Sequence, residues 1–198
     1  LTRNKNIKAE KDVKILIGDV SENPPKLPKV DIVLHFAGIT SIGSTDPNEY
    51  IKVNAVGTFN LLKRMQESGI KKMIFISTAD MYDQSKLYAN EEDVLKPETP
   101  YTTSKAIAES FCRYFADHLG FKIIVLRYSG VYGINRPRGL IYDTFQNSIK
   151  NNPIKILSNP NNQFDSIYIK DIVKNMYRVL NFIQAEDQGL DIFNIGYG

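Results

Sequence analysis

Residues 32–36 of the chain read Ile-Val-Leu-His-Phe, and apolar side chains follow one another there instead of alternating with polar ones. A strand of this kind is buried on both faces, as in a parallel sheet covered by helices on either side. The stretch therefore predicts a strand of a parallel sheet, within a run that covers 30–36. Similar short runs, rich in β-branched residues, predict strands at 13–17, 73–76, 121–126 and 154–157.

Helical spacing of apolar residues fills the segments between these strands, at 47–69, 100–119, 140–151 and 169–182. Asp46 before Pro47 is typical of a helix start, and Gly69 and Gly120 are typical of helix ends. Strands alternate with helices, so the fold class is α/β with a doubly wound parallel sheet. Ligands of such sheets bind in a crevice at the carboxyl ends of the strands.

The composition excludes several classes of partner and site. The 198 residues are 42% hydrophobic, and 25 Lys and Arg against 22 Asp and Glu leave a net charge of +3, too small to indicate nucleic acid or a membrane surface. No apolar run approaches the roughly 20 residues that span a bilayer, and the first residues do not form a signal peptide, so a cytoplasmic protein is expected. Cys112, His35 and His118 predict neither a disulfide nor a metal site; Cys112 and His35 are interpreted as packed core residues.

The motif Tyr101-Thr102-Thr103-Ser104-Lys105 lies just after Pro100, at a predicted helix start. Tyr101 and Lys105 are four residues apart and share one helix face. A tyrosine has a pKa of about 10, and a nearby ammonium favours the phenolate, which makes a usable acid or base near neutral pH. The same spacing also occurs by chance on helices, so the motif needs its context.

Thr78 supplies that context, because it ends the run Ile-Phe-Ile-Ser-Thr at the carboxyl end of a predicted strand. A hydroxyl there reaches the crevice, where the phenol and the ammonium would join it. Such a group suits hydride transfer at a carbinol carbon, with the phenol moving the proton. The alternative is that Ser77 and Thr78 only terminate the strand.

With these motifs in order, the chain resembles the extended short-chain dehydrogenases/reductases, in the NAD-dependent epimerase/dehydratase group that acts mainly on nucleotide sugars. Further segments carry the resemblance along nearly the whole chain: Gly18-Asp19-Val20, His35-Phe36-Ala37-Gly38, Val53-Asn54-Ala55-Val56-Gly57-Thr58, Leu126 to Gly133, Tyr168-Ile169-Lys170-Asp171 and Phe193-Asn194-Ile195-Gly196.

The resemblance implies a Rossmann-like fold and a role for each matching residue. Tyr101 is then the acid/base, Lys105 binds the nicotinamide ribose and lowers the tyrosine pKa, and Thr78 binds the reacting sugar hydroxyl. NAD is the implied cofactor, and a homodimer packed through the tyrosine-bearing helix is the implied assembly. The implied cofactor contacts are Asp19, Val20, Phe36, Ala37, Gly38, Asn54, Ser77, Tyr101, Lys105 and Tyr128, and the implied substrate contacts are Thr78, Asp80 and Arg136.

The chain also departs from the family pattern. The glycine-rich loop of the first strand–helix unit is not in the sequence, so we expect a part of a two-lobed protein. Residues 1–133 are interpreted as the dinucleotide-binding domain without that first unit, and 134–198 as a partial substrate-binding lobe interleaved with late elements of the first domain.

Smaller departures bear on the reaction and the cofactor. Dehydratases of the family commonly carry Asp-Glu after the threonine; here Ala79-Asp80 stands there, which favours epimerisation or reduction over elimination. Phe164 replaces a frequent arginine, so Arg136 and Arg138 are the candidates for phosphate contacts. Arg3, where an acid would indicate NAD, leaves NADP open as an alternative.

Together these features predict an NAD(P)-dependent nucleotide-sugar epimerase that uses transient hydride transfer and a tyrosine acid/base. An NADPH-dependent reductase or a dehydratase of the same family is one alternative. A non-catalytic relative that senses nucleotides or binds a partner is another, because of the absent glycine loop.

Overall fold

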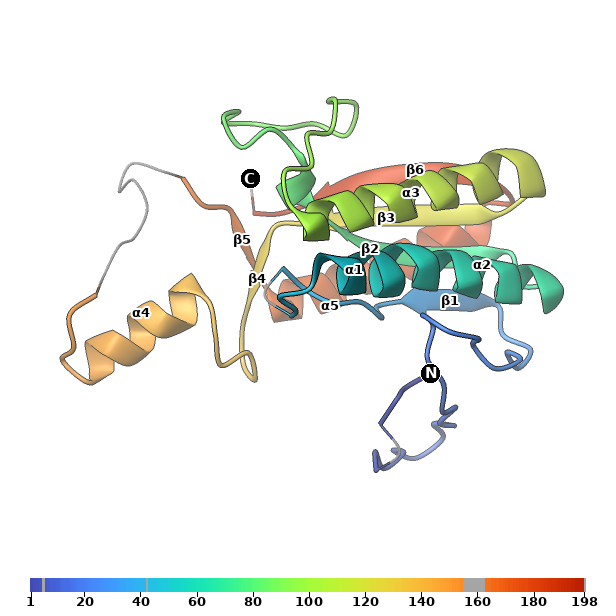
Figure 1. Cartoon of the computed structure of the whole chain (residues 1–198), viewed down its shortest axis with the longest axis horizontal. Coiled ribbons are helices and arrows are strands. Elements are labelled where there is room, and N and C mark those ends of the chain that lie inside the picture. Colours follow the sequence, from blue (N-terminus) through green and yellow to red (C-terminus); the bar gives the residue numbers. More distant parts are fainter. Residues whose placement is uncertain (5, 42, 155–162, 198) are drawn as a thin grey trace.

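A computed structural model describes residues 1–4, 6–41, 43–154 and 163–197 of the chain. Its main sheet has four parallel strands in the order β1-β2-β3-β6, and a second sheet pairs β4 with β5 (Figure 1). The strands are β1 (Ile32–His35), β2 (Lys72–Thr78), β3 (Lys122–Tyr128), β4 (Gly130–Tyr132), β5 (Ser166–Tyr168) and β6 (Gly189–Ile195).

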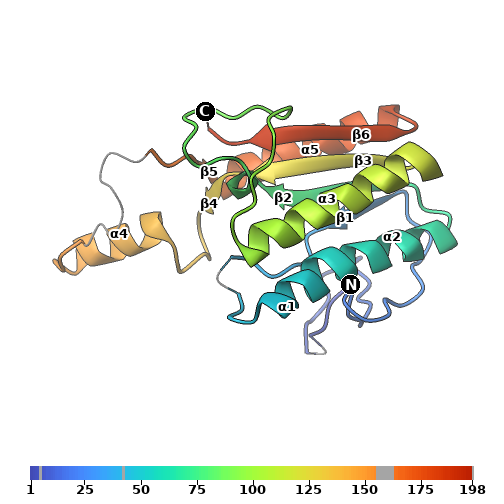
Figure 2. The same ribbon diagram turned by 45° about the horizontal axis from the view of Figure 1, so that its top comes forward.

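Helices cover both faces of the main sheet, as the sequence predicted (Figure 2). The α-helices are α1 (Pro47–Tyr50), α2 (Gly57–Glu67), α3 (Pro100–Leu119), α4 (Leu140–Ile149) and α5 (Ile169–Ala185), with a π-helical segment η1 (Ile51–Val56) and a 3-10 turn η2 (Ala79–Met81). α2 and α3 lie on one face and α5 on the other, while α4 projects from one end of the sheet (Figure 1).

The core divides into two apolar clusters, one on each face of the sheet. Met65 of α2 and Phe115 of α3 pack with Phe75 of β2 and Ile123 of β3 in the first. Ile74 and Ile124 from the same strands point the other way and pack with Ile172 and Met176 of α5 in the second. Burial on both faces explains why successive residues of β2 and β3 are apolar.

Most predicted elements are confirmed, with changed ends. The burial predicted for β1 is wrong, however: the strand lies at the edge of the described sheet and Leu34 is 41% exposed, so it is not buried on both faces. The helix predicted over 47–69 is α1, η1 and α2 in succession, with Asp46 as N-cap, and the helix over 100–119 has the bounds of α3. Gly69 and Gly120 take the positive φ angles, 71° and 65°, expected after helix ends. The segment after η2, residues 83–99, is a long loop without regular elements, as predicted. No helix of the described residues is long and apolar enough to cross a bilayer.

The strand predicted at 13–17 is wrong. Ile17 forms only an isolated bridge with Thr2, and no described strand lies beside the rest of the run to complete a ladder. Residues 155–157 of the run predicted at 154–157 lie outside the described residues, and Ile154 is in no strand. The sequence reading did not predict β4, β5 and β6 as strands.

Candidate active site at the carboxyl edge of the sheet

Thr78 is the last residue of β2, and its side chain caps the turn that follows. Its hydroxyl accepts a hydrogen bond from the Asp80 amide at 3.2 Å, and Thr78 is 5% exposed. β2 and β3 run in register here, with Ser77 opposite Arg127 and Thr78 opposite Tyr128. The carboxyl ends of two neighbouring strands therefore bring polar side chains to one edge.

Tyr101 reaches this edge from the first turn of α3. Thr99 caps the helix and forms a reciprocal capping box with Thr102, so the first turn is well defined. The Tyr101 ring lies edge-on to Tyr50, with 6.2 Å between ring centroids. Tyr101 is thus held between α1 and the end of β2.

Burial raises the pKa of Tyr101, the Thr78 hydroxyl opposes that rise, and the net shift is upward. The Asp80 carboxylate adds to the rise, and the Arg136 guanidinium opposes it. These three groups therefore act on the phenol, and at neutral pH the phenol keeps its proton. The expected lowering of this pKa by Lys105 is not seen in the structure of the chain alone, where burial has the largest effect.

Lys105 lies one turn further along α3, with its ammonium directed to the sheet. Nζ donates to the Ile76 carbonyl and lies 4.1 Å from the centroid of the Phe75 ring. Burial lowers the pKa of Lys105 to about 8. An ammonium has three N–H donors, so Lys105 retains donors for a ligand in this position.

Asn54, predicted to contact the cofactor, uses its side chain within the protein. Oδ1 accepts from the Ile39 amide at 2.7 Å, while Nδ2 donates to the Ile39 carbonyl at 2.9 Å and to the Ser104 hydroxyl at 3.0 Å. A side chain on Gly38 would bring its Cβ within 2.9 Å of Asn54 Oδ1, so the backbone must approach closely here. Asn54 therefore ties the segment after β1 to α3, and π-helical segments such as η1 are common at functional sites.

Two predicted cofactor contacts, Ser77 and Tyr128, carry hydroxyls that suit a polar ligand. The hydroxyls of Ser77 and Tyr128 are buried, and neither has a hydrogen-bond partner among the described residues. Burial raises the pKa of Tyr128 to about 12, so this hydroxyl stays a donor. Buried polar atoms without partners are rare and indicate a missing partner, and the hydroxyl and amide groups of a dinucleotide such as NAD fit this edge.

The other predicted cofactor residues differ in exposure and in hydrogen bonding. Phe36, 58% exposed, and Ala37 follow β1 on the surface. The Asp19 carboxylate accepts from the Ser21 amide at 2.9 Å and the Arg3 guanidinium at 3.4 Å; burial raises its pKa, but these groups outweigh it and the net shift is downward. Val20 is buried against Gly57. Arg3, the reason for leaving NADP open, is thus an ion-pair partner of Asp19.

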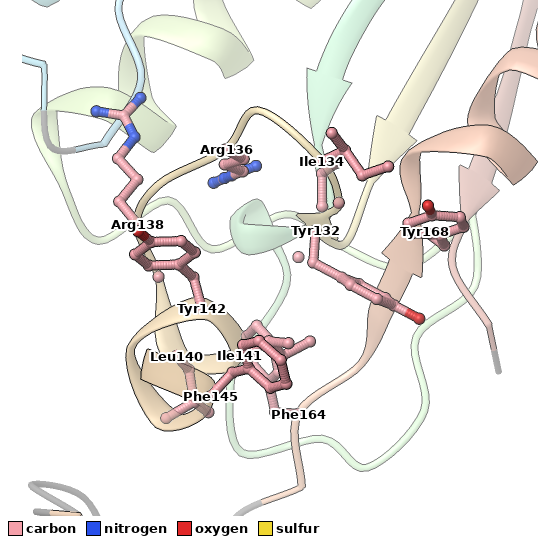
Figure 3. A pocket seen from close by; sticks show the side chains of 14 residues that line it. Tyr132, Ile134, Arg136, Arg138, Leu140, Ile141, Tyr142, Phe145, Phe164 and Tyr168 are labelled. Atoms are coloured by element: carbon pink, nitrogen blue, oxygen red, sulfur yellow. The ribbon is translucent and has the colours of Figure 1, made fainter. Parts of the chain in front are cut away.

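A pocket of about 240 Å³ opens beside this edge, between α4 and the strands β4 and β5 (Figure 3). Arg136 and Arg138 supply its positive charge, and aromatic and aliphatic side chains line the rest of its wall. Arg136 lines this pocket, and its charge also opposes the rise in the pKa of the Tyr101 phenol, which is not itself a lining residue. The wall residues Tyr132, Tyr142, Phe145, Phe164 and Tyr168 were not predicted as site residues. For Tyr142 and Phe145 a signal was present in the apolar face of α4, none of whose residues is buried.

The predicted residues therefore come together in part. Thr78, Asp80 and Arg136 act on the Tyr101 phenol, and Lys105, Ser77 and Tyr128 lie on the adjoining strands and helix. Asn54 binds only protein groups. The described residues contain no group of three metal-ligating side chains.

A parallel sheet with a phenol, hydroxyls and an ammonium at its carboxyl edge defines the Rossmann-like class of dinucleotide enzymes. The chain belongs to the NAD dependent epimerase/dehydratase family, whose family model matches residues 1–196. This membership confirms the family and fold class predicted from the sequence, and it confirms NAD as the cofactor of the family.

Relatives in the family carry out several reactions. The dTDP-4-dehydro-6-deoxyglucose reductase of Escherichia coli is 36% identical over 151 residues, 73% of this chain and 46% of that protein. The UDP-glucuronate 4-epimerase of Thermodesulfobacterium geofontis is 31% identical over 173 residues, 85% of this chain and 52% of that protein. The chain spans about half the length of the curated relatives it matches.

Solved structures agree with the fold. The UDP-glucuronic acid 4-epimerase of Bacillus cereus, solved with UDP-glucuronic acid and NAD, superposes with a TM-score of 0.75 and 26% identity, over 84% of this chain and 54% of that one.

Proposed function

We propose that this chain carries the catalytic residues of an NAD-dependent epimerase of nucleotide sugars. The observation that carries the proposal is the pairing of Tyr101 with Thr78, beside a pocket that holds two guanidinium groups and aromatic walls. Arginines suit the phosphates of a nucleotide sugar, and aromatic rings suit its base.

The residues would divide the work as follows. The Thr78 hydroxyl would bind the reacting sugar hydroxyl, and the Tyr101 phenol would exchange a proton with it. Bound NAD supplies reversible uptake of hydride from the sugar carbon. Lys105, Ser77 and Tyr128 would hold the cofactor, together with Phe36, Ala37, Gly38, Asp19 and Val20, whereas Asn54 would support it through Ile39. Asp80 and Arg136 would flank the substrate.

The protonated phenol of the free chain is suited to begin as the acid. The neighbouring Arg136 charge favours the phenolate, so a bound substrate that shields Asp80 would move Tyr101 toward the base. A phenol that can hold the proton in either direction fits a reaction that removes and returns hydride at one carbon.

A reductase is the second candidate, because the E. coli reductase is 36% identical to this chain. Elimination of water is less suited to this site, because Ala79 lacks the carboxylate that dehydratases commonly carry after the threonine. A non-catalytic relative remains the third candidate. A domain boundary near 133, a homodimer and a cytoplasmic location stay predictions; in α3, Phe115 is core and Tyr114 is 52% exposed and open to a partner.

The direct test incubates the protein with NAD and a panel of UDP- and dTDP-sugars and follows the sugar by NMR. An epimerase interconverts two sugars without net change in nicotinamide absorbance, whereas a reductase consumes NADH or NADPH. Tyr101→Phe should lower kcat by about 100-fold or more without changing the melting temperature.

Tyr177→Phe is the matched control, because Tyr177 is 68% exposed on α5, away from the candidate site. It should behave as the unchanged protein. Full activity in Tyr101→Phe would refute the assignment of the acid/base, and no turnover of any sugar would leave the non-catalytic relative as the better description.

A further inference from the structure

The loop formed by residues 83–99 joins the two halves of the candidate site. It starts after the segment that carries Thr78 and Asp80, and it ends at the cap of α3, just before Tyr101. Its path runs over the carboxyl ends of β3 and β6 (Figure 2). A contact that fixes the middle of this loop therefore also restrains the segment with Thr78 at one end and the helix start with Tyr101 at the other.

Asn194, near the end of β6, makes three hydrogen bonds: two to that loop and one to Tyr82 just before it. Its backbone amide donates to Glu91 Oε1 at 2.8 Å, and its Nδ2 donates to the Ala89 carbonyl at 3.2 Å. Its Oδ1 accepts from the Tyr82 hydroxyl at 2.8 Å. One side chain thus holds both the middle of the loop and the residue from which the loop departs.

A buried ion pair supports the same contacts from below. Arg127, opposite Asn194 in the register of β3 and β6, donates to the Tyr82 hydroxyl and to the Glu91 carbonyl. Its other nitrogens bind the Glu109 carboxylate of α3, with Nη2 at 2.7 Å from Oε2. Arg127 and Glu109 are 3% and 6% exposed, so the residues that hold Tyr82 and Glu91 are themselves buried.

We propose that Asn194 is a positioning residue that holds Thr78 and Tyr101 in register by pinning the loop between them. The inference rests on the proposed function for its catalytic consequence. Asn194 touches neither the reacting groups nor the pocket; it acts through Tyr82, Ala89 and Glu91. Small displacements of reacting groups cost large factors in rate, which gives such an anchor its importance.

The test combines hydrogen exchange with kinetics on the full chain. In Asn194→Ala, we expect backbone exchange over residues 79–99 to rise about tenfold while β3 stays protected. In the same variant kcat should fall about tenfold with KM little changed, because binding groups stay while alignment is lost. Tyr82→Phe should give part of this effect, and the double variant should lose less than the sum of the two single changes, since both break the hydrogen bond between Tyr82 and Asn194.

Asn90→Ala is the matched control within the same loop. Asn90 is exposed, and its side chain accepts only from Glu92, inside the loop. It should leave kcat unchanged and raise exchange only at its own turn. If Asn194→Ala does not fold, Asn194→Asp, which keeps the acceptor for Tyr82 but loses the donor to Ala89, should show an intermediate effect.

Unchanged exchange in Asn194→Ala, an equal effect of Asn90→Ala, or a rise in KM at constant kcat would overturn the proposal. If the unaltered protein turns over no sugar, the proposed function fails and the catalytic link falls with it. The exchange data then still decide whether Asn194 anchors the loop.

Discussion

Lys105 carries a positive charge into a largely buried place. The residue is 7% exposed, and one carbonyl and one aromatic face surround its ammonium. Burial alone accounts for most of the lowered pKa, which is about 8 against a usual 10.5. The folded chain therefore releases this proton more easily than the unfolded chain.

This difference predicts a stability that rises with pH. The unfolded state binds more protons at Lys105 between pH 8 and about 10.5, so the free energy of unfolding increases there as pH rises. From pH 7.5 to 9.5 the gain from this residue is about 2 kcal/mol. Urea titrations at both pH values would measure it.

Lys105→Met is the comparison, since methionine keeps the chain length without a titrating group. The free energy of unfolding of the original protein, minus that of the variant, should increase by about 2 kcal/mol from pH 7.5 to 9.5. An equal pH slope in both proteins would show that Lys105 is not the source.

Single residues also show which features of the candidate site could be predicted from the sequence. Thr78 and Tyr101 were found because residue types and strand ends predict their meeting. The binding of Asn54 to Ile39, and the pKa of Tyr101, depend on distances between segments far apart in sequence, which no local pattern contains. Cys112 and His35 were predicted as packed core residues, and both are buried; burial lowers the pKa of His35 to about 3, so it is neutral.

Among the elements, α3 has the clearest local specification. Thr99 and Thr102 each accept the other's backbone amide, and Gly120 ends the helix in the left-handed region. Because Tyr101 follows the cap by two residues, the cap also sets the direction of the phenol.

Thr99→Ala should therefore reduce both stability and turnover. Loss of an N-cap of this kind costs about 1 kcal/mol in the free energy of unfolding. We also expect a lower kcat, because the first turn that carries Tyr101 frays. Thr103→Ala in the same turn removes no capping hydrogen bond and should change neither quantity; equal losses in both variants would contradict the role of the cap.

Helices and strands could be predicted where local residues determine them, but not where pairing with a distant strand determines them. Helices with caps and strands buried on both faces were found nearly at their true bounds. The run at 13–17 has the composition of a strand but only Thr2 as a partner, and β6 was missed although it pairs along its whole length with β3. β-structure depends on a neighbour, which sequence periodicity does not reveal.

For the whole molecule, the pair of Arg127 and Glu109 connects the sheet to the helix layer. Both side chains lie in the interior, and removal of one leaves the other charge without a partner. Arg127→Met alone should lower the free energy of unfolding by about 3 to 5 kcal/mol, measured by urea denaturation.

The double variant Arg127→Met with Glu109→Gln should lose clearly less than the sum of the two single changes, because no unpaired charge remains. Additive losses would mean that the two side chains act separately.

The order of the main sheet has a consequence for how the chain acquires its structure during synthesis. β3 starts at Lys122, and its partner Gly189 begins β6 much later in the chain, so this pairing closes a long segment. Contacts between distant segments form slowly, because chain entropy is lost before the pairing is gained. One edge of β3 therefore stays open to other strands until residues 189–195 leave the ribosome, and an assisting chaperone would have most to protect in that interval.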